Sequence, residues 1–329
     1  MAQGRAQGRA RVTRRSALPY LYILPAFVVM AVVTYWPMAF QVWMSFTDYG
    51  LGNLRQDAPL PNFVGLENYI GLLTNAISIP NFDFFRMLGF NLWWTFSNVA
   101  LHVSLGVAIA LLLNAKGLRF RGVYRAIYIL PMVIPQLVVA NIFRNMFDPD
   151  YGAINQGLAV LGSLFGVEQA AFHIRWIDQI DPPIPGIPLT LSYFALLVTN
   201  TWLGWPFMTV VASAALQSID KEFYEAAHMD GASAWQRFRH ITLPLLRPAM
   251  VPAAMFGIIW TFNLFNIIYF VSGGGPLRQT EILVTTAFRL VNEQRLYGAA
   301  AAFGVYTLLI LLALTFITNR ISRATESAV

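Results

Sequence analysis

Long apolar segments alternate with short polar ones along most of this chain. Six apolar segments reach the length of a membrane span, at residues 18–46, 88–114, 126–147, 189–216, 249–271 and 297–318. A helix rises about 1.5 Å per residue, so about 20 apolar residues suffice to cross the hydrocarbon core of a bilayer. The pattern therefore predicts an all-α, polytopic membrane protein with six transmembrane helices.

The connecting segments predict little structure outside the membrane. Residues 48–86 are polar and contain Pro and Gly, and 148–188 adds only a weakly amphipathic stretch, 154–165, and a proline-rich run. Both segments are too short to form a separate domain. We expect a basic tail at 1–17, the first helix and its outer loop at 18–87, a transmembrane domain at 88–320 and a second tail at 321–329.

Composition supports the membrane assignment. The 329 residues are 57% hydrophobic and only 12% charged, with a mean hydropathy of +0.55, whereas about a quarter of the residues in soluble domains are charged. There is no cysteine, which excludes disulfides and thiolate metal sites. The net charge of +6 could suggest nucleic acid, but its distribution along the chain indicates membrane topology instead.

The basic residues gather in the tails and in alternate loops. With six helices and both termini on one side, the tails and the loops at 115–125 and 218–248 hold 15 of the 22 Lys and Arg but only 5 of the 16 Asp and Glu. Cytoplasmic segments of membrane proteins carry such an excess of Lys and Arg. We therefore expect both termini and the 218–248 loop in the cytoplasm.

The 218–248 loop is predicted to be a helical hairpin. Asp220 is placed to cap a first helix, and Gly231 supplies the positive φ that a sharp break requires. Ser233 and Gln236 have the spacing of a capping box for a second helix, which Pro244 would end. Exposed aromatic residues on such a hairpin are typical of a surface that docks into a partner's groove.

This loop resembles a family motif, the EAA loop of permeases from binding-protein-dependent ABC importers. The matching residues, in order, are Glu225-Ala226-Ala227, Gly231, Ile241 and Leu243-Pro244. The resemblance implies contact with an ATPase through Glu225, Ala226, Ala227, Asp230, Gly231, Ile241, Leu243 and Pro244. The alternative is an amphipathic hairpin that only lies on the lipid surface. Such a hairpin would not require these residues at these spacings.

Missing residues disfavour several other activities. Neither Lys116 nor Lys221, the only lysines, follows the glycine pattern of a Walker A loop, so we expect ATP and Mg²⁺ on separate ATPase subunits. No Asp or Glu lies within the six segments, although ion-coupled carriers and acid–base or metal enzymes need such groups. We therefore expect no catalytic residue, metal site or cofactor in this chain, and interpret His102 as a packing residue.

The wider resemblance covers residues 88–320. The stretches Trp202–Met208 and Phe262–Tyr269, with Gly274-Gly275-Pro276, are similar to the maltose-type sugar permeases of this importer class. That family implies a type I ABC importer permease fold, a second homologous permease, two ATPase subunits and a soluble sugar-binding protein. It also implies a location in the cytoplasmic (inner) membrane of a bacterium or archaeon. Segment 148–188 is too short for the large extracytoplasmic domain of some maltose permeases.

The resemblance also implies a sugar-binding face. Counted from Glu225, the family's sugar-contact positions fall on Leu203, Gly204 and Phe207 in the fourth span and on Gly257, Trp260, Thr261 and Leu264 in the fifth. Steps of three and four residues would place the last four on one face of a helix. Gly257, Thr261 and Leu264 replace polar residues of the family, so the sugar need not be maltose. Asn263 and Asn266 lie on a neighbouring face, and we interpret them as interhelical hydrogen-bonding residues.

The sequence thus predicts a permease subunit of an ATP-driven ABC importer, with membrane lipid around it. It would move a sugar, such as maltose, a malto-oligosaccharide or another disaccharide, from an extracytoplasmic binding protein to the cytoplasm by alternating access. Two alternatives stay open. One is a permease of the same class for another substrate, such as glycerol phosphate, an oligopeptide or a metal. The other is an ion-coupled secondary carrier, which the carboxylate-free spans disfavour.

Overall fold

The computed structural model describes residues 20–55, 57–77, 79–115 and 117–326; the expected tail at 1–17 and Lys116 lie outside them. Within the described residues the chain is helical and forms no strand, apart from an isolated bridge between Thr47 and Phe63. Five helices are long and apolar enough to cross a membrane: Tyr20–Met44, Phe84–Leu113, Leu191–Ser218, Ala234–Phe262 and Tyr297–Arg320. A bent helix pair supplies a sixth candidate. The prediction of an all-α membrane protein is confirmed.

The chain divides into two compact units. Of the described residues, those up to Leu72 and Leu290–Val305 form one unit, and those within Leu73–Arg289 and from Tyr306 on form the other. In the first unit, the helix that begins at Tyr20 widens into a π-turn at Ala31–Tyr35 (η1) before continuing as α2 (Trp36–Met44). Pro37 lies in the first turn of α2. Proline has no N–H to donate a regular helical hydrogen bond. The wider turn therefore occurs where the ladder of backbone hydrogen bonds would be incomplete.

The first unit is closed by polar contacts after α2. The hydroxyls of Ser45 and Tyr69 lie 2.6 Å apart and connect the end of α2 to α3 (Glu67–Leu73). The Gly298 N–H donates to the Tyr49 carbonyl (2.9 Å), which fixes the start of α14 (Tyr297–Glu326) within this unit.

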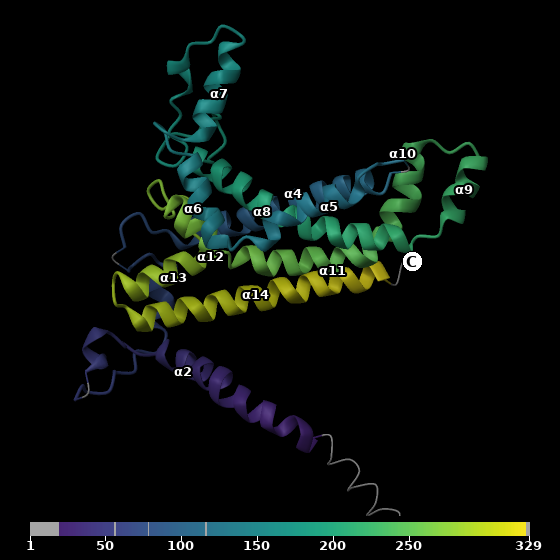
Figure 1. Ribbon diagram of the computed structural model, residues 1–329. Coiled ribbons are helices and arrows are strands. Elements are labelled where there is room, and N and C mark those ends of the chain that lie inside the picture. The colour runs from purple at the N-terminus through teal and green to yellow at the C-terminus, as the bar shows by residue number, and fades with distance from the viewer. Residues whose placement is uncertain (1–19, 56, 78, 116, 327–329) are drawn as a thin grey trace, which may run out of the picture. The chain divides into compact units, whose positions relative to one another are not determined.

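The centre of the second unit is made by three helices that run side by side (Figure 1): α4 (Phe84–Leu113), α8 (Leu191–Ser218) and α11 (Leu243–Phe262). Buried polar side chains connect them. Asn200 Nδ2 donates to Asn98 Oδ1 (2.8 Å), and Asn91 Nδ2 donates to the Phe262 carbonyl (3.1 Å). Such interhelical bonds satisfy groups that lipid cannot. His102 Nε2 lies 3.0 Å from the Asn200 carbonyl, which confirms that His102 is a packing residue.

The third predicted span, 126–147, is two helices rather than one. α5 (Arg121–Val133) and α6 (Gln136–Met146) meet at an angle of 94°. The break follows from Pro135, because the residue before a proline avoids the helical conformation. Ile134 accordingly has a ψ of 130°.

The bent pair lies beside α8. Phe147, after α6, packs in a cluster with Tyr193 near the start of α8. Asn114, at the end of α4, accepts a hydrogen bond from Gln217 near the end of α8 (3.4 Å). By length and composition, the pair is a candidate for one broken span or for a re-entrant loop.

The fifth predicted span, 249–271, starts and ends earlier than expected. One continuous helix runs from α10 (Ala234–Arg237) through a π-turn at Phe238–Thr242 (η4) into α11. Contrary to the prediction, Pro244 does not end this helix. Pro244 lies in the first turn of α11. The N–H of the preceding residue, Leu243, donates to the Phe238 carbonyl five residues earlier. The N–H that proline lacks is therefore missing at a point where the regular series of i to i−4 hydrogen bonds is already interrupted.

Beyond Phe262 the chain leaves the helix at Asn263 and Leu264 and continues as α12 (Phe265–Ile267) and a π-turn at Ile268–Ser272 (η5). The remaining elements connect the spans: η2 (Leu51–Leu54), α7 (Ala153–Ser163), η3 (Gln169–Phe172) and α13 (Leu283–Asn292). α7 occupies the predicted amphipathic stretch, whereas α13 was not predicted. α14 continues past the expected end at 318, to Glu326.

Candidate functional site

The 218–248 loop folds as the predicted hairpin, with α9 (Lys221–Met229) and α10 as its arms (Figure 1). Asp220 caps α9 by accepting from the Glu222 N–H (3.1 Å). Ser233 and Gln236 form a capping box at α10, with bonds of 2.7 and 3.3 Å. Gly231 has a φ of +77°, which glycine adopts without strain. The predicted caps and break are confirmed.

Six of the predicted ATPase-contacting residues lie on this hairpin. Ala227, Asp230, Gly231 and Ile241 line a cavity of about 370 Å³ between its arms, and Glu225 and Ala226 are exposed on α9. We call these six residues the hairpin surface. Leu243 and Pro244 lie apart from it, where η4 passes into α11. Contact of all eight with an ATPase stays a prediction.

The hairpin is joined to the spans by a continuous helix. The Tyr224 hydroxyl on α9 lies 2.9 Å from the Thr242 hydroxyl, so both arms are tied to the same helix. From Ala234 to Phe262 this helix has 29 residues, or about 42 Å. A displacement of the hairpin surface therefore reaches Phe262 through one secondary-structure element.

The predicted sugar-contacting residues of the fourth span face the interior of the second unit. Gly204 lies against the ring of His102, which leaves no room for a Cβ atom. Leu203 and Phe207 pack on two hydrophobic clusters, and the rings of Phe207 and Phe256 lie 5.9 Å apart. These residues shape helix packing here, and their contact with a sugar stays a prediction.

The predicted residues of the fifth span are separated by the end of α11. Gly257 faces a methionine of α8, and Thr261 and Leu264 are only 2% and 5% exposed, whereas Trp260 is 55% exposed. The single helical face expected for these four residues does not form. The helix stops at Phe262, and Leu264 has a non-helical ψ of 78°.

A cavity of about 380 Å³ lies beside this break, and we call it the amide cavity. It is lined by Gln136, Phe256, Ile259, Trp260, Asn263, Leu264, Phe265 and Asn266. Asn266 Nδ2 donates to Gln136 Oε1 on α6 (3.3 Å), which confirms the interhelical role expected for Asn266. Asn263 instead donates to the Ile259 carbonyl of its own helix (3.2 Å). Each amide has a further donor or acceptor that these bonds do not use.

Sequence reasoning placed Trp260 and Leu264 at this site but missed Gln136 and Phe256. The available signal was Asn263, because an Asn within an apolar run can mark the end of a helix. Once the helix ends there, the helical spacing used to group residues 257–264 no longer applies.

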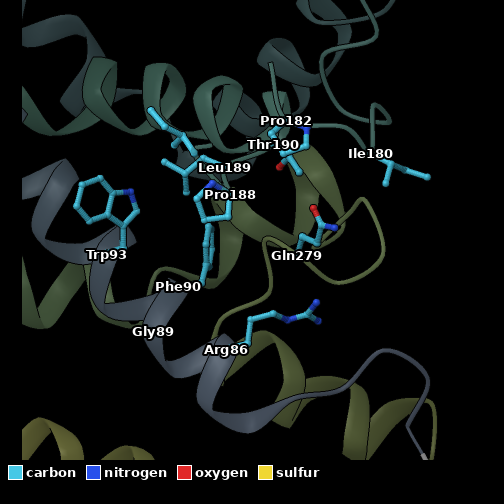
Figure 2. A pocket seen from close by; sticks show the side chains of 11 residues that line it. Arg86, Gly89, Phe90, Trp93, Ile180, Pro182, Pro188, Leu189, Thr190 and Gln279 are labelled. Atoms are coloured by element: carbon cyan, nitrogen blue, oxygen red, sulfur yellow. The ribbon is translucent and has the colours of Figure 1, made fainter. Parts of the chain in front are cut away.

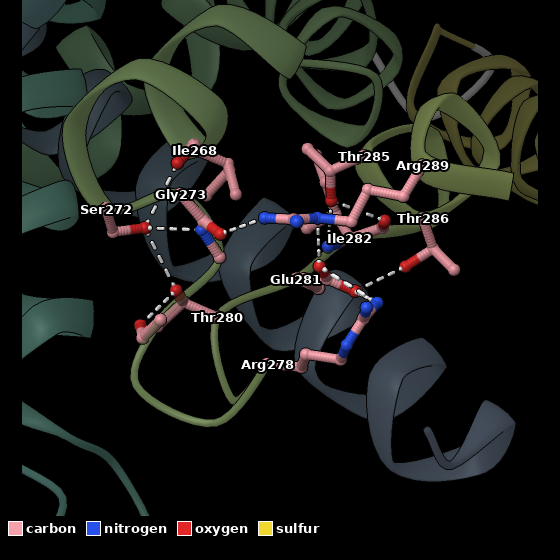
Figure 3. Close-up of polar contacts among 12 residues, drawn as sticks. Ile268, Ser272, Gly273, Arg278, Thr280, Glu281, Ile282, Thr285, Thr286 and Arg289 are labelled. Atoms are coloured by element: carbon pink, nitrogen blue, oxygen red, sulfur yellow. Dashed lines mark hydrogen bonds and ion pairs between the residues drawn. The ribbon is translucent and has the colours of Figure 1, made fainter. Parts of the chain in front are cut away.

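A buried ion cluster joins the loop that follows α12 and η5 to α13 (Figure 3). The Glu281 carboxylate is paired with Arg289 Nε (2.7 Å) and Arg278 Nη1 (3.2 Å) and accepts from the Thr286 hydroxyl (2.8 Å). Gly274, with a φ of +77°, packs so closely on Glu281 that a Cβ atom would clash. Two arginines thus neutralise this carboxylate. Among the described residues, no group of three or more His, Asp or Glu could hold a metal ion.

The chain is similar to known transport proteins. A family model described as "binding-protein-dependent transport system inner membrane component" matches residues 103–327. The "trehalose/maltose transport system permease protein MalF" of Thermococcus litoralis is 32% identical over 313 residues, which cover 94% of this chain and 95% of that protein. The "galactooligosaccharides transport system permease protein GanP" of Bacillus subtilis is 32% identical over 293 residues, which cover 87% of this chain and 66% of that protein.

A solved structure shares the fold. It is the "bacterial alginate ABC transporter in complex with alginate pentasaccharide-bound periplasmic protein", with a TM-score of 0.73 and 21% identity. The similarity covers 95% of this chain and 96% of the other. It confirms the expected permease fold.

Proposed function

This chain belongs to the family of binding-protein-dependent transport system inner membrane components, and we propose that it is the permease subunit of an ATP-driven sugar importer that works by alternating access. The continuous helix Ala234–Phe262 carries the proposal, because it joins the hairpin surface to the amide cavity. Rigid secondary-structure elements of this kind carry coupling between distant sites.

The hairpin surface would dock into one of two separate ATPase subunits, which bind ATP and Mg²⁺. Phe223 and Trp235 on the hairpin are 56% and 65% exposed, and exposed aromatic residues on a helix suit a groove in a partner protein. The chain has no Walker A loop of its own. Hydrolysis would therefore take place on the partner chains, and this chain would respond to their closure.

The substrate we propose is a sugar, with the amide cavity on its path. The rings of Phe256 and Trp260 lie 5.8 Å apart and offer apolar faces on which a sugar ring can stack. Asn263, Asn266 and Gln136 supply amide groups for sugar hydroxyls. Within the described part of the chain no charged residue lines this cavity, which disfavours a phosphate ester or a metal ion. The names of the two relatives, trehalose/maltose and galactooligosaccharide permeases, support the sugar class.

Two further partners would complete the importer. Phe256 and Trp260 are 53% and 55% exposed, so one side of the amide cavity is open, and a second homologous permease would close it. A soluble sugar-binding protein would deliver the substrate on the extracytoplasmic side. The alginate transporter of similar fold was solved with a periplasmic protein of this kind.

The proposed orientation places both termini and the hairpin in the cytoplasm of a bacterium or archaeon, as the distribution of Lys and Arg favours. Ala115 and Ser163 are exposed, and the chain has no cysteine that would give background labelling. An impermeant thiol reagent on intact cells should label Ser163→Cys but not Ala115→Cys, which should react after permeabilisation. The opposite pattern would invert the topology.

Purification of the complex with its binding protein tests the function directly. Mass spectrometry of the bound ligand should find a neutral disaccharide or oligosaccharide, and the same sugar should stimulate ATP hydrolysis in liposomes. A bound peptide, phosphate ester or metal would contradict the sugar class. Uptake that follows an ion gradient without ATP would contradict the importer class.

A further inference from the structure

A second cavity, of about 590 Å³, opens beside α4 (Figure 2). It is bounded by α4, by the proline-rich segment before α8, and by the turn that carries Gln279. The apolar lining residues are Phe90, Trp93, Ile180, Pro182, Ile187, Pro188 and Leu189. Trp93 lies at one side of the cavity, and Arg86 and Gln279 lie toward the other (Figure 2). The cavity therefore has an apolar part and a polar part.

This cavity is separate from the amide cavity, because none of the residues that the structure describes lines both. Asn91 and Trp94 bond to the end of α11, whereas the lining residues of α4 share a neighbouring face of that helix. Phe85 and Phe96, also on α4, are 63% and 45% exposed. An exposed apolar surface on a membrane span is suited to contact with lipid.

The position of the cavity along α4 matches the edge of a bilayer. α4 begins at Phe84, so Arg86 lies in the first turn and Trp93 about 10 Å further along the axis. The interfacial layer on each side of the hydrocarbon core is roughly 5–8 Å thick, and tryptophan is enriched there. With Trp93 at that boundary, Arg86 lies at the level of the lipid headgroups.

Arg86 has a charge available for an anion. One Nη atom donates to the Asn81 carbonyl (2.8 Å), and the Asp83 carboxylate caps α4 by accepting from the Arg86 backbone N–H (2.8 Å). Among the residues that the structure describes, no carboxylate forms an ion pair with the Arg86 guanidinium. A guanidinium binds phosphate through paired hydrogen bonds, and the Gln279 amide can add another donor.

We propose that this cavity binds an anionic phospholipid from the outer leaflet, with its phosphate at Arg86 and Gln279 and an acyl chain along Phe90 and Trp93. A free anion would leave the apolar part unfilled. A sugar would bring many hydroxyl groups to a lining whose polar side chains, among the described residues, are Arg86, Thr190 and Gln279. Unpaired hydroxyls are costly to bury. The inference does not depend on which substrate is transported.

Native mass spectrometry of the intact transporter complex in mild detergent tests the site. After incubation with equal amounts of phosphatidylglycerol and phosphatidylethanolamine, the wild-type complex should retain phosphatidylglycerol selectively. Arg86→Gln should weaken that retention about tenfold, or about 1.4 kcal/mol, and Arg86→Lys should largely preserve it. Trp93→Ala should weaken retention of both lipids. The matched control is Arg175→Gln, whose exposed side chain lies 3.9 Å from Asp178 and outside the cavity.

Three outcomes would overturn the proposal. The first is equal phosphatidylglycerol retention by the wild type and Arg86→Gln. The second is displacement of the lipid by inorganic phosphate, which would show that the site recognises a free anion. The third is retention of the transported sugar by the wild type but not by Arg86→Gln, which would make the cavity a sugar site. Unchanged thermal unfolding of each variant complex would exclude misfolding as the cause of lipid loss.

Discussion

The two ends of the helix Ala234–Phe262 are held in different ways. At the hairpin end, the capping box and Gly231 define the turn through contacts between near neighbours, and the hairpin surface is open. At the other end, the carbonyls of Thr261 and Phe262 accept bonds from Trp94 (3.2 Å) and Asn91 (3.1 Å) on α4. One end is free for a partner to move, and the other is anchored. We therefore expect a force on the hairpin to tilt the helix about its anchored end.

The largest effect should come from the free end. Glu225→Lys should abolish sugar-stimulated ATP hydrolysis while leaving membrane insertion intact. If Glu225 meets a basic residue of the ATPase, reversal places like charges together at an interface, which costs several kcal/mol. ATPase assays of the reconstituted complex measure this, with Asp57→Lys as a control on another exposed loop. Wild-type stimulation in Glu225→Lys would remove this residue from the coupling.

The second largest effect should be on stability, at the buried ion cluster around Glu281 that follows α12. Glu281→Gln leaves two partly buried arginines without their carboxylate, and breaking a buried pair costs about 3 kcal/mol or more. Thermal or denaturant unfolding of the purified complex should report this loss. The control, Asp178→Asn, removes an exposed pair with Arg175 that should contribute about 0.5 kcal/mol or less. Equal losses of stability in the two variants would show that the buried cluster contributes no more than an exposed ion pair.

A smaller effect is expected at the amide cavity. Trp260→Ala removes the exposed ring beside Phe256 and should cost more than about 1 kcal/mol of sugar binding, which is about fivefold in affinity. Uptake of a series of sugars into liposomes that contain the reconstituted complex measures this loss of sugar binding. Trp36→Ala, which removes another exposed ring (69% exposed) from the first span, should have no effect. Wild-type uptake of every sugar by Trp260→Ala would place the binding site elsewhere.

The smallest effect is expected for Asn266→Ala. It removes one interhelical hydrogen bond to Gln136, and such bonds contribute about 0.6 kcal/mol on average. Unfolding of the complex should change by about that amount. If the loss of sugar affinity exceeds the loss of stability, the amide also contacts substrate. A stability loss above about 2 kcal/mol would exceed the range known for such bonds and would contradict this interpretation.

The hairpin was predictable because its signals are local. Ser233 and Gln236 are three positions apart, Asp220 caps the helix that follows it at once, and Gly231 ends a helix through its own backbone. The approximate positions of the spans were predictable for a similar reason, because each depends on the apolar content of one continuous segment.

The amide cavity was only partly predictable because residues distant in sequence determine it. The carbonyls at the end of α11 are bound by side chains 167 and 171 positions away, and Gln136 reaches the site from the bent helix pair. Pro135 was visible in the sequence, but the 94° angle depends on how α5 and α6 pack along α8. The helix end predicted at Pro244 was wrong because the effect of this proline depends on the π-turn before it.

The π-turn at Phe238–Thr242 also sets a rotational phase. A π-turn contains one residue more than a regular helical turn, and each residue advances an α-helix by about 100°. Because the extra residue is accommodated within a single turn, deleting it would let the ladder of backbone hydrogen bonds close as a regular helix with little rotation of the hairpin around the axis that it shares with Trp260. Deleting one residue from a regular turn of the same helix would instead rotate the hairpin by about 100°, so that the hairpin surface would face a different direction. Compatibility between this chain and the ATPase proposed as its partner is thus a matter of azimuth as well as of residue identity.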